Sequence, residues 1–138
     1  MSTVDLLAIF PHPDDAELTC GGTLLKSARQ GYRVGILDLS AGEMASRGTV
    51  ALRTEESAKA ASILRVSVRE NLKLPDSGLK NDPESRLAVA RAIRRFKPSI
   101  VITTAPSPFG PGCGRWPRTS LHSSPRRPTQ PDGRSLAS

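Results

Sequence analysis

The residues with the clearest potential for chemistry lie in the segment FPHPDDAE, residues 10–17. His12 and Asp15 are three positions apart in a proline-braced turn, so their side chains can point the same way. An imidazole nitrogen and a carboxylate oxygen suit zinc, with iron as a second choice. Asp14 lies between them and is expected to point elsewhere, which leaves it free to take a proton from a water. The alternative is an ordinary hydrogen-bonded turn in which an aspartate only caps the backbone.

Apolar runs and helical patterns alternate through the first 104 residues. β-strands are predicted where continuous apolar or β-branched runs occur, and helices where apolar or small residues recur at helical spacing. The order indicates an α/β fold, Rossmann-like, with a mostly parallel sheet and helices on both faces. The predicted strands are residues 4–10, 33–40, 66–74 and 99–104, and the predicted helices are 22–30, 49–64 and 82–96.

Three polar loops follow the first three predicted strands: FPHPDDAE, SAGEMASRG and PDSG. In a parallel sheet the carboxyl ends of the strands meet at one edge, and ligands of open α/β sheets bind there. We therefore expect these loops to form one site.

Composition fits a single globular domain, with 37% hydrophobic and 24% charged residues. No apolar run reaches the roughly 20 residues of a membrane span, and the amino terminus lacks a secretory signal, so a cytoplasmic location is expected. Cys20 and Cys113 form no CxxC motif and are predicted to be free thiols.

The last segment, residues 105–138, differs from the rest of the chain. It is rich in proline, glycine and serine, has no helical or strand periodicity, and carries +4 of the net charge of +7. We expect the domain to comprise residues 1–104, followed by a tail that is either disordered or the product of a damaged reading frame. The nucleotide sequence around codon 105 distinguishes these alternatives.

The segment AIFPHPDDAELTCGGTL resembles the opening motif of the LmbE-like, PIG-L-type deacetylases, which are zinc-dependent enzymes that remove N-acetyl groups from amino sugars. Two later segments, GEMASRGT and NLKLPDSGL, resemble the branch that deacetylates N-acetylglucosaminyl malate in bacillithiol synthesis. The resemblance covers roughly residues 4–104 and not the tail.

This resemblance implies roles for individual residues. His12 and Asp15 correspond to zinc ligands and Asp14 to the general base. Arg53 and Asp76 correspond to substrate-binding residues, although a solvated helix arginine and a turn aspartate are the ordinary readings of these two positions. Arg47 is a candidate contact for the malate carboxylates, or it forms a loop ion pair with Glu43.

The chain also departs from the family pattern. Family members supply a third zinc ligand from a His-Pro-Asp-His-type segment after the fourth strand, and no such segment is present. His122, in the tail, is a poor substitute because a Pro/Ser-rich segment would have to become ordered to present it. The family's remaining strands are missing as well, so the sheet is expected to keep an exposed edge.

Three functional interpretations follow. The first is a zinc-dependent N-deacetylase that acts on a small amino-sugar conjugate. It is expected to have no membrane partner, and the resemblance implies that intact family members can form a homo-oligomer. The second is an inactive fragment of such an enzyme. The third is a non-enzymatic binder of a polyanion through the basic tail, for which five tail arginines and a single tryptophan are a weak case.

Overall fold

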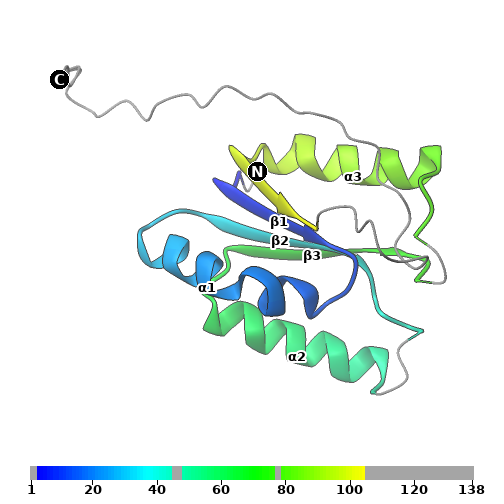
Figure 1. Ribbon diagram of the computed structural model, residues 1–138, viewed down its shortest axis with the longest axis horizontal. Helices are drawn as coiled ribbons and strands as arrows, with labels where there is room; N and C mark the ends of the chain where they lie inside the picture. The colour runs from blue at the N-terminus through cyan, green and yellow to red at the C-terminus, as the bar shows by residue number, and fades with distance from the viewer. Residues whose placement is uncertain (1–2, 45–47, 77–78, 105–138) are drawn as a thin grey trace.

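Four strands and three helices alternate along the chain in the computed structural model, which describes residues 3–44, 48–76 and 79–104. Figure 1 shows the strands side by side with the helices packed around them. Predictions made for Arg47, Cys113, His122 and the whole tail lie outside the described residues. The elements are β1 (Leu6–Phe10), α1 (Asp15–Arg29), β2 (Val34–Ser40), α2 (Val50–Ile63), β3 (Val68–Leu74), α3 (Pro83–Phe96) and β4 (Ile100–Thr103).

The strands form one parallel sheet in the order β3-β2-β1-β4. Ala8 in β1 pairs with Ile36 in β2 on one side and with Ile102 in β4 on the other. The chain runs outward from β1 to β3 and then crosses to the far side of β1, so the strand order reverses between β1 and β4. This confirms the predicted α/β fold with a parallel sheet, and it puts the turn after β1 at the switch point where such sheets bind ligands.

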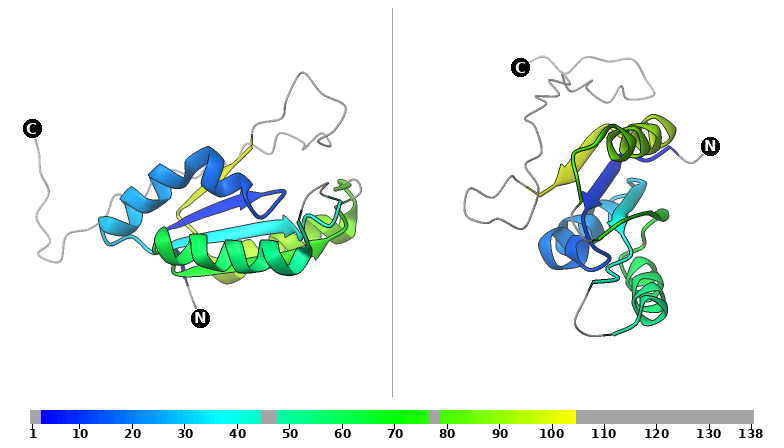
Figure 2. Two further views of the ribbon diagram at one scale, coloured as in Figure 1. Left: turned by 90° about the horizontal axis from the view of Figure 1, so that it is seen from below. Right: turned by 90° about the vertical axis from the view of Figure 1, so that its right-hand side faces the viewer.

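Helices cover both faces of the sheet, with α1 and α2 on one face and α3 on the other (Figures 1 and 2). Each face has its own core. Leu7 and Leu37 pack toward Phe96 of α3, whereas Ala8 and Ile36 belong to the cluster with Leu24 of α1. All residues of β1 and β2 are buried. The continuous apolar run that predicted β1 reflects this two-sided burial, and β2 buries Asp38 and Ser40 among its apolar residues.

Side chains cap the amino termini of α2 and α3. The side chain of Thr49 accepts a hydrogen bond from the Leu52 amide, and that of Asp82 accepts one from the Ser85 amide, so both act as N-caps. Pro83 occupies the first turn of α3, where its missing N–H costs nothing.

The predicted start of the first helix at residue 22 is wrong, because α1 begins at Asp15. Cys20 departs from helical geometry, with φ −139° and ψ 16°, so α1 is two short helices joined at a kink. Glycine at positions 21 and 22 disfavours a helix locally, but burial of Ala16 and Leu24 against the sheet stabilises helix on both sides of the kink.

The fourth strand lies at the edge of the described sheet. Two of its apolar side chains are open to solvent, with Ile100 57% exposed and Val101 39% exposed. This agrees with the expectation of an exposed sheet edge. Among the described helices, none has the length and apolar character needed to cross a membrane.

Candidate metal and substrate site

The turn between β1 and α1 is closed by hydrogen bonds between its own residues. The Asp15 amide donates to the His12 carbonyl at 3.3 Å, and the His12 amide donates to Oδ2 of Asp15 at 2.9 Å. These bonds fold the side chain of Asp15 back over the turn. The predicted convergence of residues 12 and 15 therefore follows from the local backbone.

Each ring nitrogen of His12 faces a carboxylate. Nδ1 lies 3.1 Å from Oδ2 of Asp15, and Nε2 lies 2.8 Å from Oδ1 of Asp76. A neutral imidazole carries one N–H and can donate to only one of them. Both carboxylates can be satisfied at once if both ring nitrogens carry a proton. They can also be satisfied if Nε2–H donates to Asp76 while Nδ1 and the Asp15 carboxylate bind one cation.

Asp76 joins the loop after β3 to the other two loops of this edge. Besides His12, its carboxylate accepts a hydrogen bond from the Met44 amide at 3.0 Å, and its own amide donates to Glu43 at 2.8 Å. The side chain of Asp76 is only 7% exposed. Burial by itself would raise the pKa of Asp76, but the hydrogen bonds from the Met44 amide and the His12 ring hold this pKa below its usual value.

The donor atoms of His12 and Asp15 fit part of a zinc site. Two ligand atoms at tetrahedral angles on one zinc ion lie about 3.4 Å apart, given zinc–ligand distances near 2.1 Å. The 3.1 Å between Nδ1 and Oδ2 is close to that value. Within the described residues no group of three His, Cys, Asp or Glu side chains is arranged to hold a metal ion. The described part of the chain thus offers two candidate ligands, and Asp76 holds the other nitrogen of the histidine.

Asp14 is exposed, and its side chain takes no part in the hydrogen bonds that join His12 to Asp15. It occupies the N-cap position of α1, yet its side chain makes no capping hydrogen bond. It lines a groove of about 500 Å³ between α1 and α2. Leu18 and Leu52 also line this groove and are largely exposed.

Arg53 lines the same groove as Asp14. Its guanidinium lies against the loop after β2, since a Cβ atom at Gly42 would be 2.9 Å from its Nη1. Gly42 has φ +69°, a conformation that also favours glycine. The structure thus brings two predicted site residues, Asp14 and Arg53, to one groove next to the His12 turn. The alternative pairing of Glu43 with Arg47 involves a residue outside the described part of the chain.

Sequence reasoning missed three charged residues beneath the turn: Glu17, Asp38 and Arg69. Arg69 in β3 forms ion pairs with Asp38 in β2 and Glu17 in α1. The clearest signal in the sequence was Asp38 between two leucines of a predicted strand, whereas Arg69 is one of three charged residues in the predicted strand 66–74. Burial raises the pKa of Asp38, and the hydrogen bond and charge of Arg69 limit that rise.

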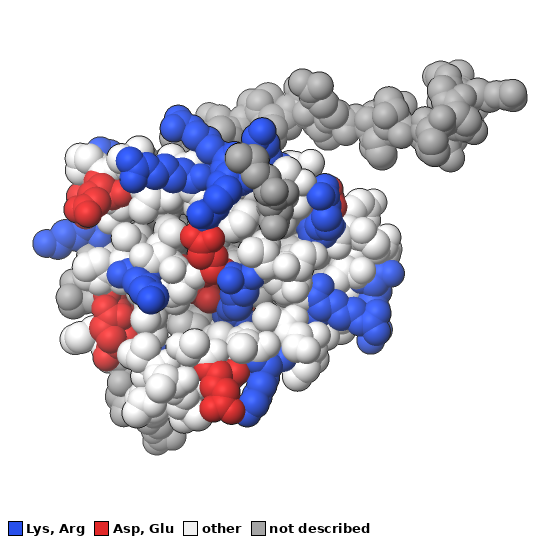
Figure 3. Space-filling model, turned by 180° about the vertical axis from the view of Figure 1, so that it is seen from behind, with Lys and Arg blue, Asp and Glu red and all other residues white. Residues whose placement is uncertain are grey.

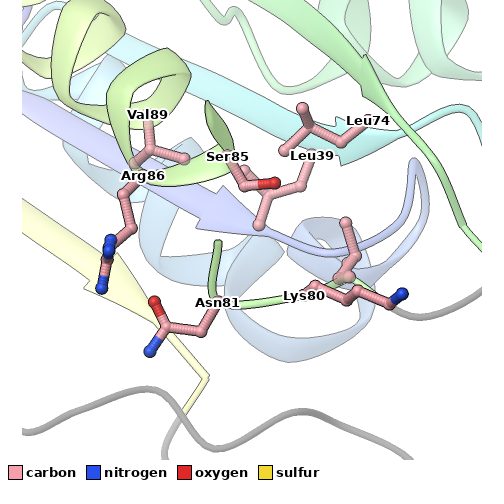
Figure 4. A pocket seen from close by; sticks show the side chains of 8 residues that line it. Leu39, Leu74, Lys80, Asn81, Ser85, Arg86 and Val89 are labelled. Carbon is pink, nitrogen blue, oxygen red and sulfur yellow. The ribbon is translucent and has the colours of Figure 1, made fainter. Parts of the chain in front are cut away.

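A second cavity lies on the other face of the sheet, between the first turns of α3 and the ends of β2 and β3 (Figure 4). Its volume of about 20 Å³ is close to the space that one water needs. Leu39, Leu74 and Val89 line it together with Ser85. None of the predicted site residues contributes to this cavity, so it is not a candidate for the substrate.

Charged side chains of both signs are interspersed on the face shown in Figure 3. Arg95 of α3 forms an ion pair with Glu70 of β3.

Comparison with known proteins identifies the class to which this fold and motif belong. The family model described as PIG-L, GlcNAc-PI de-N-acetylase, matches residues 7–110. The chain therefore belongs to the PIG-L family of de-N-acetylases, as the sequence resemblance predicted.

Individual relatives agree with this assignment. A diacetylchitobiose deacetylase from Thermococcus kodakarensis is 32% identical over 108 residues, which cover 73% of this chain and 40% of the relative. The crystal structure of the conserved protein TT1542 from Thermus thermophilus has 50% identity and a TM-score of 0.69, covering 72% of this chain and 45% of that one. The N,N'-diacetylchitobiose deacetylase from Pyrococcus horikoshii has 28% identity and a TM-score of 0.64, covering 70% and 39%. The chain thus spans less than half the length of these relatives.

Proposed function

We propose that this protein is a zinc-dependent hydrolase that removes the N-acetyl group from an N-acetylglucosamine conjugate. One observation carries the proposal: His12 and Asp15 direct Nδ1 and Oδ2 to within 3.1 Å of each other at the switch point, and the adjacent Asp14 is exposed. Membership of a de-N-acetylase family and the deacetylase relatives support the reaction class.

His12 and Asp15 would hold the zinc ion, and Asp76 would fix the orientation of the His12 ring through Nε2. When bound, zinc supplies a Lewis acid that polarises the acetamide carbonyl and acidifies water. Asp14 would accept the proton of the attacking water, because its carboxylate is exposed on the groove wall and does not cap α1. The same carboxyl could then return that proton to the departing amine.

Arg53 is proposed to bind the polar end of the substrate. Its guanidinium lines the groove that contains Asp14, so a substrate lying there could contact both residues. A guanidinium binds carboxylates well, which suits a malate conjugate. The bacillithiol assignment rests on the resemblance of GEMASRGT and NLKLPDSGL to that branch. Asp76 is the other candidate for substrate binding, and its carboxylate lies within hydrogen-bond distance of the His12 ring and the Met44 amide.

The test is amine release by the full chain in the presence of zinc, with two substrates in parallel: N-acetylglucosaminyl malate and N,N'-diacetylchitobiose. We expect a fluorogenic amine reagent to report deacetylation of the malate conjugate, and faster than that of the chitobiose. Faster reaction with chitobiose would contradict the bacillithiol assignment alone. A folded chain that releases no amine from either substrate would contradict the enzymatic proposal and favour the inactive-fragment interpretation.

A further inference from the structure

Arg69 reaches from the sheet to the turn that carries His12, Asp14 and Asp15. Its Nε and Nη2 atoms donate to the carboxylate of Asp38 at 2.8 and 3.1 Å, and its guanidinium also pairs with Glu17. Nη1 donates to the Ser57 carbonyl at 3.2 Å. One arginine thereby joins β2, β3, α1 and α2 on a single face of the sheet.

The contact that concerns the site is the one with Pro13. Nη2 of Arg69 donates to the Pro13 carbonyl, which also accepts a hydrogen bond from Oγ of Ser57 at 3.3 Å. Pro13 is buried and lies between the two proposed ligands in the sequence. Its carbonyl fixes the peptide plane between Pro13 and Asp14, and hence the angle at which the chain passes from His12 to Asp15.

Stability alone does not explain why the charges of Arg69 and Asp38 are buried. The side chain of Arg69 is 10% exposed and that of Asp38 is 3% exposed, so both charges are largely removed from water. Buried ion pairs often contribute no more stability than apolar side chains of similar volume. The planar fork of arginine can meet two carboxylates and a carbonyl at once, which lysine, as a single point charge, cannot do.

We propose that Arg69 is a positioning residue that holds the His12–Asp15 turn in its ligand-binding conformation through the Pro13 carbonyl. Its role in zinc binding rests on the proposed function. Its effect on the geometry of the turn is independent of that function and can be measured without metal.

The test uses the full chain with His122→Gln as background, because the sequence contains two histidines and this change leaves His12 as the only one. Arg69→Lys keeps the charge and loses the fork. Arg95→Lys is the matched control, since Arg95 forms an exposed ion pair with Glu70 beside the same strand. Two quantities are compared at equal folded fraction: the ¹⁵N shifts of the His12 ring without metal, and zinc affinity by competition with a chromophoric chelator.

We expect Arg69→Lys to shift or broaden the ring signals of His12 and to weaken zinc binding by about ten-fold or more, the range found for groups that orient metal ligands. Arg95→Lys should change neither quantity. A folded Arg69→Lys chain with unchanged ring signals and unchanged zinc affinity would overturn the proposal. If the background chain binds no zinc, the zinc assignment of the proposed function fails, and the ring signals alone decide the role of Arg69.

If Arg69→Lys does not fold, two variants of Ser57, which leave the ion pairs of Arg69 in place, test whether the Pro13 carbonyl controls the turn. Ser57→Ala removes the second donor to the Pro13 carbonyl and leaves the ion pairs intact, whereas Ser57→Thr keeps a hydroxyl. A change in the ring signals of His12 with alanine but not with threonine supports control of the turn through this carbonyl. Identical ring signals in both variants and the background chain would count against it.

Discussion

Three neighbouring residues of one turn lie in three different environments. His12 is held between two carboxylates, Asp15 folds back toward His12, and Asp14 is exposed on a groove. The spacing in the sequence was sufficient to predict that the side chains of residues 12 and 15 converge. Which acid holds the second ring nitrogen could not be predicted, because Asp76 is 64 positions away and depends on the order of the strands.

Replacement of the exposed acid should separate catalysis from metal binding. Asp14→Asn keeps the size of the side chain but cannot accept the proton of water, so we expect amine release to fall by about 10²- to 10⁴-fold. Zinc affinity should remain near that of the wild type, because the proposed ligands are His12 and Asp15 and not Asp14. Equal losses of zinc affinity and activity in Asp14→Asn would mean that this residue is a ligand and not the base.

Asp76 should contribute to metal binding through His12. Asp76→Asn weakens the contact with Nε2, and we expect zinc affinity to fall by about 10- to 100-fold, as for other groups that orient a ligating histidine. Glu55→Gln is the control, since Glu55 forms an exposed pair with Lys59 on α2. Chelator competition measures both, and wild-type affinity in Asp76→Asn would argue that Asp76 serves the substrate instead.

The elements themselves were predictable to the extent that their signals are local. N-caps at Thr49 and Asp82 and glycine after α1 at residue 31 define helix ends that need no tertiary information. The start of α1 was not predictable in this way. Packing of Ala16 on the sheet outweighs two glycines that favour a turn. The Arg69 network was missed for a similar reason, because its partners come from three separate elements.

Two glycines near α1 should respond in opposite directions to alanine. Gly22 lies within α1, has no positive φ, and a Cβ there would meet nothing within 4 Å. Gly22→Ala should therefore raise the free energy of unfolding by about 0.4–1 kcal/mol. Gly31 has φ +90°, so Gly31→Ala should lower that free energy. Urea unfolding measures both, and a loss of stability in Gly22→Ala would mean that the kink at Cys20 requires glycine.

At the scale of the whole molecule, the alternation of strands and helices in the sequence was sufficient to predict the fold class. It was not sufficient to predict how many strands the sheet contains. The described part of the chain has four strands, and the chain spans 40% of the diacetylchitobiose deacetylase from Thermococcus kodakarensis and 45% of TT1542. Its edge strand β4 exposes Ile100 and Val101. An exposed apolar edge strand is a template for pairing with another chain.

A charge on this edge should therefore reduce self-association. Ile100→Lys replaces a side chain that is 57% exposed, so the free energy of unfolding should change by no more than about 0.5 kcal/mol. Light scattering at increasing protein concentration should show less association than in the wild type. Leu87→Lys, on the exposed side of α3, controls for the added charge. Equal reductions in both variants would show that net charge and not the strand edge is responsible.

The most direct test of this account is an equilibrium zinc titration of the full chain alongside Asp15→Asn and Asp14→Asn. The two variants remove one carboxylate each from adjacent positions of the same turn, so their charge change is identical. We predict that zinc binding by the wild type is lost in Asp15→Asn and retained in Asp14→Asn. Equal affinity in the two variants, or a folded wild-type chain that binds no zinc, would contradict the assignment of His12 and Asp15 as ligands.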